Sequence, residues 1–326
     1  RGSVLLLGPL LARRGRARLA PPGGDFPARR TISTHLEALG AMGARLLDGG
    51  PGHHLEAPEG LKPASLYLYE ASVTGTETAV LAAVTAPGLS EIRHAACEPH
   101  VVELCEFLNE LGASITGAGT STIRIEGGGP LRGTTHRLWG DYIEAGSWAV
   151  VGAVTGGDVD VRGARAEDIE VVAAVLKRLN VECTIGESSF RVRPSKPRAA
   201  GRITAGLWPG FPSDFVSLVT VLATQAEGRT LVHDGRYELR LFALEQLSAM
   251  SADLFLCDPH RIIVTGRQRL RGRPLDSRDL RSGMALIAAA LAADGESRLA
   301  RLGTFERGYA QVVDRLGGLG ARVERA

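Results

Sequence analysis

The stretch Cys105–Thr116 reads CEFLNELGASIT: a helical segment, a small residue at Gly112, and then a short apolar strand. Glycine and asparagine tolerate the left-handed backbone conformation that commonly ends a helix. The same phrase occurs five times at intervals of 68 to 71 residues, with the small residue at Gly43, Gly112, Asn180, Ser251 and Gly320. We therefore expect each of these small residues to end a helix.

A second phrase keeps the same period and consists of a helix rich in small residues, a glycine turn and an alternating strand. Its turns lie 67 to 73 residues apart, at Gly15, Gly88, Gly157, Gly228 and Gly295. Two independent markers with one period indicate an internal repeat. A unit of two helices and a few strands is too small to bury its own core, so several units must pack together.

The domain organisation follows from the number of repeats. A chain of 326 residues exceeds the usual size of one hydrophobic core. Two repeats precede residue 140 and three follow it, which predicts one domain over residues 1–139 and a second over 140–326. The first domain would be one repeat short of the second, so we expect the sequence to lack an N-terminal segment.

Composition excludes several classes of protein. Hydrophobic residues make up 44% and charged residues 23%, and the net charge of +2 requires neither nucleic acid nor a membrane surface. The four cysteines form no CxxC pair, and the sequence has no HExxH or GxxxxGK[ST] motif and no dinucleotide fingerprint in its strand-to-helix context. We therefore expect a cytoplasmic protein without metal, disulfide or cofactor.

One loop places an acid beside two arginines. Residues 21–30 read PPGGDFPARR, so that Asp25 lies close to Arg29 and Arg30. Guanidinium groups suit phosphate and carboxylate oxygens, and a nearby acid can donate or accept a proton. The local pattern alone favours a solvated glycine-rich loop. In the same way, Asp214 in the sequence FPSD fits either a catalytic base or, more often, a helix N-cap.

Taken in order, the motifs of the whole chain resemble those of the UDP-N-acetylglucosamine enolpyruvyl transferases of peptidoglycan synthesis. EPSP synthase shares their fold but lacks this set of motifs. The motifs are LGPLLAR (7–13), PPGGD (21–25), SVTGTE (72–77), CEP (97–99), GDYIEAG (140–146), FPSD (211–214), DLRSG (279–283) and ERGY (306–309).

The resemblance implies a two-domain inside-out α/β barrel built from βαβαββ-type repeats, five of six being present. It implies transfer of the enolpyruvyl group of phosphoenolpyruvate, a co-substrate, to the 3-hydroxyl of UDP-N-acetylglucosamine. Asp25 stands at the position of the proton donor, where most members carry cysteine. Asp214 stands at the position that takes the proton of the sugar hydroxyl.

The resemblance also implies the remaining site residues. We expect Arg30, Arg240, Arg281 and Arg307 to bind phosphoenolpyruvate and to converge with Asp214 in a cleft between the domains. The positions implied for the nucleotide sugar are Arg1, Arg30, Thr31, Ile32, Ser33, Thr34, His35, Glu70, Ser72, Val73, Thr74, Asp214 and Arg236.

Some positions depart from the family pattern. Glu70 stands where several members have lysine, Trp208 where many have histidine, and Arg236 where the nucleotide's neighbour is apolar. The family's N-terminal Lys-Asn pair has no counterpart, since it would precede Arg1. Two alternatives therefore stay open: transfer to another nucleotide in a secondary-metabolite pathway, or a non-catalytic paralogue that binds a nucleotide sugar.

Overall fold

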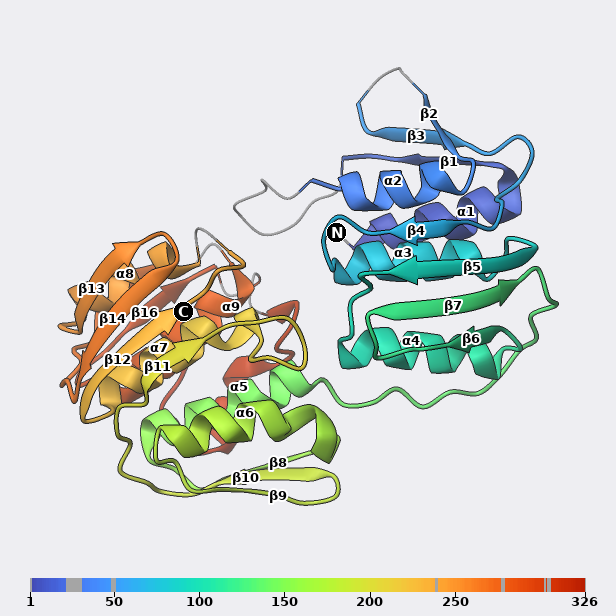
Figure 1. Cartoon of the computed structure of the whole chain (residues 1–326). Coiled ribbons are helices and arrows are strands. Elements are labelled where there is room, and N and C mark those ends of the chain that lie inside the picture. Colours follow the sequence, from blue (N-terminus) through green and yellow to red (C-terminus); the bar gives the residue numbers. More distant parts are fainter. Residues whose placement is uncertain are drawn as a thin grey trace. The chain divides into compact units, whose positions relative to one another are not determined.

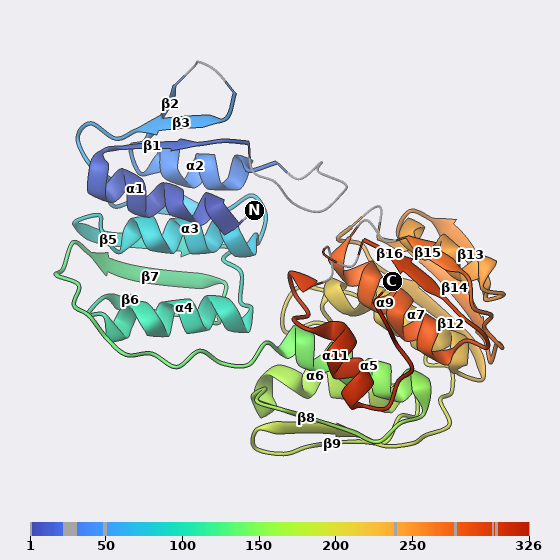
Figure 2. The same ribbon diagram turned by 180° about the vertical axis from the view of Figure 1, so that it is seen from behind.

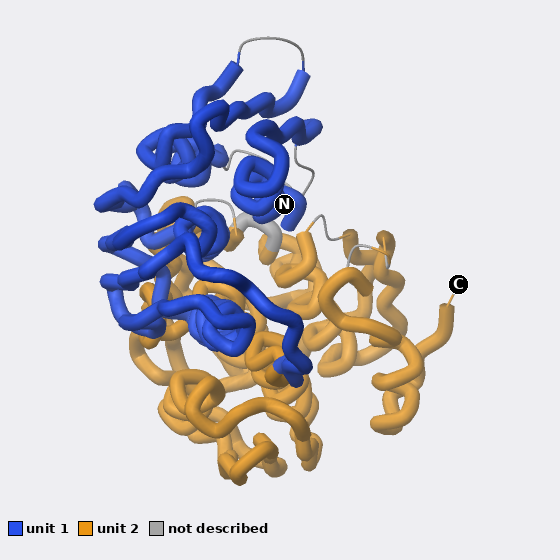
Figure 3. The backbone as a smooth tube through the Cα atoms, turned by 90° about the vertical axis from the view of Figure 1, so that its right-hand side faces the viewer, with its two compact units in different colours: residues 1–138 blue, residues 139–326 orange. Residues whose placement is uncertain are grey.

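The chain was analysed as a computed structural model, which describes residues 2–21, 31–47, 51–237, 240–276, 279–301, 303 and 306–325 (Figure 1). The fold divides into two compact units, residues 1–138 and 139–326, coloured separately in Figure 3. The division lies one residue before the boundary expected from the repeats.

The elements of unit 1 alternate between helices and short strands. They are η1 Gly2–Leu6, α1 Leu7–Arg14, β1 Arg16–Leu19, α2 Ser33–Ala41, β2 Arg45–Leu47, β3 His53–Glu56, β4 Ser65–Tyr67, α3 Val73–Ala83, β5 Gly88–Arg93, α4 Pro99–Glu110, β6 Ser114–Thr116 and β7 Thr122–Gly127.

Unit 2 continues the alternation. Its elements are α5 Tyr142–Thr155, β8 Val159–Arg162, α6 Ala166–Arg178, β9 Cys183–Ile185, β10 Ser189–Val192, β11 Gly201–Thr204, η2 Ser213–Phe215, α7 Val216–Gln225, β12 Gly228–His233, η3 Leu241–Leu244, α8 Glu245–Ala249, β13 Asp253–Asp258, β14 Arg261–Gly266, β15 Pro274–Asp276, α9 Leu280–Ala292, β16 Arg298–Ala300 and α11 Val312–Gly318.

The repeats give the same sheet topology in both units. Unit 1 contains a sheet of order β4-β5-β7-β6 and unit 2 one of order β11-β12-β14-β13, each with its first two strands parallel and the others antiparallel. The parallel pairs also match in register: Leu66 lies opposite Ile92, and Ile203 opposite Val232. All four side chains are buried. The period in the sequence therefore reflects one supersecondary unit.

The small residues that mark the repeat lie where the sequence predicts them. Each has a positive φ directly after a helix: 93° at Gly43, 104° at Gly112, 58° at Asn180, 73° at Ser251 and 93° at Gly320. The second marker is displaced in one repeat, because Gly156, with φ 68°, ends α5 in place of the expected Gly157. Glycine takes this conformation without the steric cost that a side chain adds.

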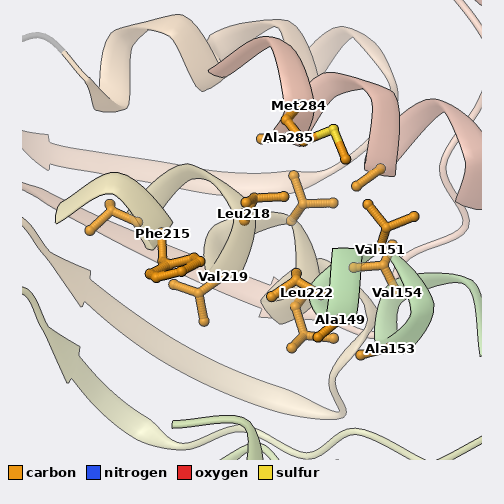
Figure 4. Close-up of a cluster of buried hydrophobic side chains, with 14 of the residues drawn as sticks. Ala149, Val151, Ala153, Val154, Phe215, Leu218, Val219, Leu222, Met284 and Ala285 are labelled. Atoms are coloured by element: carbon orange, nitrogen blue, oxygen red, sulfur yellow. The ribbon is translucent and has the colours of Figure 1, made fainter. Parts of the chain in front are cut away.

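The core of unit 2 is formed by helices, with the sheets outside. Helices α5, α7 and α9 contact one another and bury nearly all of their side chains. Figure 4 shows Val151 of α5, Leu218 and Leu222 of α7, and Met284 of α9 in one apolar cluster. In unit 1, α3 is buried in the same way and contacts α1 and α2 (Figure 2). Buried central helices agree with the inside-out architecture expected from the sequence.

In the part of the chain that the structure describes, no helix is long and apolar enough to cross a bilayer. Among the same residues, no three His, Cys, Asp or Glu side chains are grouped as metal ligands would be.

Candidate active site

The predicted site residues fall into three groups. Arg1, Asp25 and Arg30 lie outside the described residues, so their predicted roles stay predictions. A second group, with Asp214 at its centre, belongs to unit 2. A third group belongs to unit 1 and surrounds the first turns of α2 and α3.

In unit 2 the structure brings together three side chains that are distant in sequence. Oδ1 of Asp214 lies 3.1 Å from Nη1 of Arg240 and 3.5 Å from Nε of Arg281. The Asp214 side chain is 39% exposed, whereas those of Arg240 and Arg281 are 10% and 19% exposed. The two cations are thus held in the protein while the carboxylate remains accessible to a ligand hydroxyl.

Asp214 differs from the acids at equivalent points of neighbouring repeats. Asp141 and Asp279 cap α5 and α9, since each carboxylate accepts hydrogen bonds from two backbone N–H groups of the helix that follows. Asp214 instead lies inside the 3-10 helix η2, and neither Pro212 before η2 nor Phe215 before α7 provides a side-chain cap. The N-cap interpretation that the local sequence favoured is therefore wrong, and Asp214 points to the arginines.

Arg240 is fixed by several groups. Its Nη1 also donates to the backbone carbonyl of Ser213, and its guanidinium lies 4.6 Å from the ring centroid of Tyr237. The fully buried Asp234 connects the two loops involved: it accepts from Oγ of Ser213 at 2.5 Å and from the backbone N–H of Arg236 at 2.9 Å. The loop before α7 and the loop after β12 are therefore linked through one carboxylate.

Both the backbone and the side chain of Arg281 donate hydrogen bonds to neighbouring side chains. Its N–H donates to the capping carboxylate of Asp279 at 3.0 Å, and its Nη1 donates to the hydroxyl of Tyr309 at 3.1 Å. Burial disfavours the charged guanidinium, but the nearby Asp214 carboxylate and Tyr309 outweigh it and raise the pKa of Arg281 above its ordinary value. Arg281 is thus a permanent cation beside Asp214.

Two predicted arginines lie at the margin of this group. Arg236 and Arg307 are both exposed. Arg236 lies two residues after the buried Asp234, and its backbone N–H donates to the Asp234 carboxylate. Arg307 lies two residues before Tyr309. Both arginines are therefore close in sequence to residues that support the cluster. Their contacts with a ligand stay predictions.

In unit 1 the structure joins residues about forty positions apart. Nε2 of His35, on α2, lies 2.9 Å from Oγ1 of Thr74, on α3, and Oγ1 of Thr34 donates to Glu70 at 3.5 Å. Ser72 caps α3 by accepting from the N–H of Gly75 at 3.2 Å. The N-termini of α2 and α3 therefore lie side by side, as binding to one ligand would require.

Burial decides which of these groups a ligand can reach. The side chains of Ile32, Thr34 and His35 are buried, with 4 to 7% exposed. Thr31 and Ser33 are exposed, and their hydroxyl groups lie 2.8 Å apart. Any contact of a ligand with the first turn of α2 would therefore use these hydroxyls and the backbone N–H groups.

Sequence reasoning missed three residues that support the unit 2 cluster: Ser147, Asp234 and Tyr309. Tyr309 lies in the motif ERGY, and Ser147 directly follows GDYIEAG. No local pattern assigns them a role, because their contacts are distant in sequence. Ser147 and Tyr309 lie 162 positions apart, and Asp234 contacts Ser213, 21 positions away.

Comparisons with known proteins bear on the family and the fold. The family model of EPSP synthase (3-phosphoshikimate 1-carboxyvinyltransferase) matches residues 1–316. The enolpyruvyl transferase NikO from Streptomyces tendae aligns with a TM-score of 0.87 and 26% identity, over 99% of this chain and 77% of that one. EPSP synthase from Acinetobacter baumannii, 22% identical, shares the fold with a TM-score of 0.75 over 99% of this chain and 78% of its own. The family match over residues 1–316 and the shared fold thus define the class of 1-carboxyvinyl (enolpyruvyl) transferases.

Curated relatives narrow the assignment within that class. The UDP-N-acetylglucosamine 1-carboxyvinyltransferase of Borrelia garinii is 38% identical over all of this chain and 78% of its own length. That of Treponema denticola is 40% identical over 99% of this chain and 78% of its own. The chain belongs to the UDP-N-acetylglucosamine 1-carboxyvinyltransferase family.

Proposed function

We propose that the protein transfers the enolpyruvyl group of phosphoenolpyruvate to the 3-hydroxyl of UDP-N-acetylglucosamine and releases phosphate. The observation that carries the proposal is the partly exposed Asp214 carboxylate between Arg240 and Arg281. The names of the curated relatives support the same reaction. In the cell the reaction would begin peptidoglycan synthesis in the cytoplasm, and so contribute to cell shape and division.

The first half of the reaction is an addition. Asp214 accepts the proton of the sugar 3-hydroxyl while the sugar oxygen bonds to C2 of phosphoenolpyruvate. Asp25 donates a proton to C3, which becomes a methyl group. The product is a tetrahedral ketal that still carries the phosphate.

The second half is an elimination. The C2–O bond to phosphate breaks, and the phosphate leaves with the proton that Asp214 had accepted. The ionised Asp25 takes back a proton from the new methyl group, and the C2–C3 double bond forms again as an enol ether. Arg240 and Arg281 neutralise negative charge on the phosphate and carboxylate oxygens, because guanidinium groups bind such oxygens with paired N–H donors. Arg30 and Arg307 would serve the same purpose.

The nucleotide would be bound by unit 1. The N-terminus of a helix carries partial positive charge and free N–H groups, and it favours phosphate oxygens. The adjacent N-termini of α2 and α3, together with Thr31 and Ser33, offer such a site for the diphosphate. Arg1 and Arg30 would add positive charge.

Two observations favour a second acceptor. The Glu70 carboxylate lies at the same helix ends, 3.5 Å from the Thr34 hydroxyl, and Arg236 is exposed where the family has an apolar residue. The negative charge of Glu70 at these helix ends opposes a diphosphate and would tolerate a less charged nucleotide. Turnover with a panel of nucleotides that differ in phosphate number separates the two acceptors.

The proposed acid can be tested through fosfomycin. This epoxide inhibits the family by alkylating the cysteine that Asp25 replaces, and a carboxylate is a much poorer nucleophile than a thiolate. We expect the wild-type protein to turn over in the presence of fosfomycin, and Asp25→Cys to turn over but be inhibited. Asp25→Asn should lose about a hundredfold or more of activity, as expected when a general acid is removed.

Mass spectrometry after fosfomycin treatment supplies the direct readout. Asp25→Cys should gain one covalent adduct on residue 25, whereas the wild-type protein should gain none. An adduct on wild-type Asp25, or full activity in Asp25→Asn, would show that Asp25 is not the proton donor.

A further inference from the structure

Tyr309 occupies a buried position next to the unit 2 cluster. It lies in the turn before α11, and none of its surface is exposed. Its hydroxyl is within hydrogen-bonding distance of two helices of the core: 3.1 Å from Nη1 of Arg281 on α9 and 2.9 Å from Oγ of Ser147 on α5. One hydroxyl group therefore joins the first and the last repeat of unit 2.

The direction of every hydrogen bond in this chain of groups can be assigned. Ser147 donates its single hydroxyl proton to the carbonyl of Ile143 at 2.7 Å, so towards Tyr309 it can only accept. Tyr309 must then donate its proton to Ser147. Its oxygen is left to accept from Arg281, which has only donors. The sequence of donors is thus Arg281, Tyr309, Ser147 and finally the Ile143 carbonyl.

This directed chain requires a neutral tyrosine. Burial in the protein raises the pKa of Tyr309 above its ordinary value, and this effect outweighs the lowering by Arg281. The phenol therefore keeps its proton and points a lone pair at the guanidinium. Phenylalanine fills the same space but supplies neither the proton nor the lone pair.

The two partners of the Arg281 side chain lie at different nitrogens of its guanidinium. Asp214 lies 3.5 Å from Nε, whereas Tyr309 accepts from Nη1. An ion pair at one nitrogen and a hydrogen bond at another together restrict the rotation of the planar group as well as its position. The turn that carries Tyr309 also carries Arg307. This turn packs closely on the start of α9, since a Cβ at Gly308 would lie 2.6 Å from Cδ2 of Leu280.

We propose that Tyr309 is a positioning residue, whose hydroxyl, supported by Ser147, orients Arg281 toward Asp214 and the phosphate or carboxylate of the substrate. The proposal rests on the proposed function for its catalytic consequence, but the orientation of Arg281 can be measured without turnover. A misplaced catalytic group can lower the rate about a hundredfold even when the fold is intact.

The first test is spectroscopic. In protein labelled with 15N-arginine, the Nε–H signal of Arg281, assigned by its loss in Arg281→Ala, should exchange slowly with solvent. Tyr309→Phe and Ser147→Ala should both accelerate that exchange. Thr220→Val is the matched control: it also removes a fully buried hydroxyl, one that donates to the carbonyl of Val216 at 2.7 Å, but it does not touch Arg281. Unchanged exchange in Tyr309→Phe would overturn the proposal.

The second test is kinetic and uses a double-mutant cycle on the full chain with phosphoenolpyruvate and UDP-N-acetylglucosamine. Tyr309→Phe should lower kcat about ten- to a hundredfold in the wild-type background and have little further effect in Arg281→Ala. Equal losses in both backgrounds would mean that Tyr309 acts through general stability, and would overturn the proposal.

The two tests separate two failures. If the wild-type protein does not turn over these substrates, the proposed function fails, and the exchange of Arg281 Nε–H still supports or refutes the role of Tyr309. If the wild-type protein turns over and Tyr309→Phe matches it in both tests, the role of Tyr309 fails alone.

Discussion

A buried carboxylate in unit 1 allows a quantitative prediction about stability. Glu77 lies on α3, and only 8% of its surface is exposed. Burial, and secondarily the negative charge of Glu98, raise its pKa from 4.5 to about 7. Glu77 is therefore largely protonated in the folded protein under conditions where it is ionised in the unfolded chain.

The sign of the pH dependence follows from proton binding. Between pH 4.5 and about 7 the folded state holds a proton that the unfolded state has lost, so the free energy of unfolding falls as pH rises. Below this window both states are protonated, and above it both are ionised. A shift of this size, at about 1.4 kcal/mol per pH unit, costs about 3 kcal/mol of stability above the window.

We predict that Glu77→Gln removes this pH-dependent loss of stability, because glutamine does not ionise. Hydrogen exchange of the α3 amides, followed by mass spectrometry and corrected for the intrinsic exchange rate, reports unit 1 directly. Tryptophan fluorescence does not, because Trp139, Trp148 and Trp208 all belong to unit 2. The wild-type protein should lose about 3 kcal/mol of α3 protection between about pH 5 and pH 8.5, and Glu77→Gln should lose much less.

Glu37→Gln provides the control, since it removes an exposed glutamate from α2 in the same unit. Its pH dependence should follow that of the wild-type protein. The reasoning would be refuted if Glu77→Gln and Glu37→Gln behaved alike, or if α3 gained protection as pH rose from 5 to 8.5.

The remaining predictions concern a helix end and the proposed base. Gly112 has φ 104°, and a Cβ there would lie 3.2 Å from the carbonyl oxygen of Pro130, so Gly112→Ala should lower the free energy of unfolding by about 1–2 kcal/mol. Ser251→Gly, at φ 73°, should raise it by up to about 1 kcal/mol, and urea denaturation measures both. Asp214→Asn should lower kcat by about a hundredfold or more in a phosphate-release assay while the fold, followed by circular dichroism, is retained.

The repeat architecture could be predicted from the sequence because its signals are local. Each helix end depends on one residue that tolerates a positive φ, and such residues recur with a fixed period. Even Asn180 and Ser251, which have side chains, take the conformation predicted for them. The one displacement, from Gly157 to Gly156, is within the usual uncertainty of a helix end between two adjacent glycines.

The support of the site could not be predicted in this way. The sequence FPSD fits a helix cap as well as a base, and the choice depends on Arg240 and Arg281, which lie 26 and 67 positions further along the chain. Burial of Glu77, and the contact between Ser147 and Tyr309, likewise result from packing between repeats. Resemblance to a family identifies residues at motif positions, whereas the residues that orient them become visible only in the folded chain.

The central claim is that this protein adds an enolpyruvyl group to UDP-N-acetylglucosamine. The most direct measurement is mass spectrometry of the nucleotide after incubation of the protein with UDP-N-acetylglucosamine and phosphoenolpyruvate. The account predicts an enolpyruvyl ether of the acceptor, formed with one phosphate released per product molecule and lost in Asp214→Asn. An unmodified UDP-N-acetylglucosamine, with another nucleotide modified or phosphate released without any product, would contradict it.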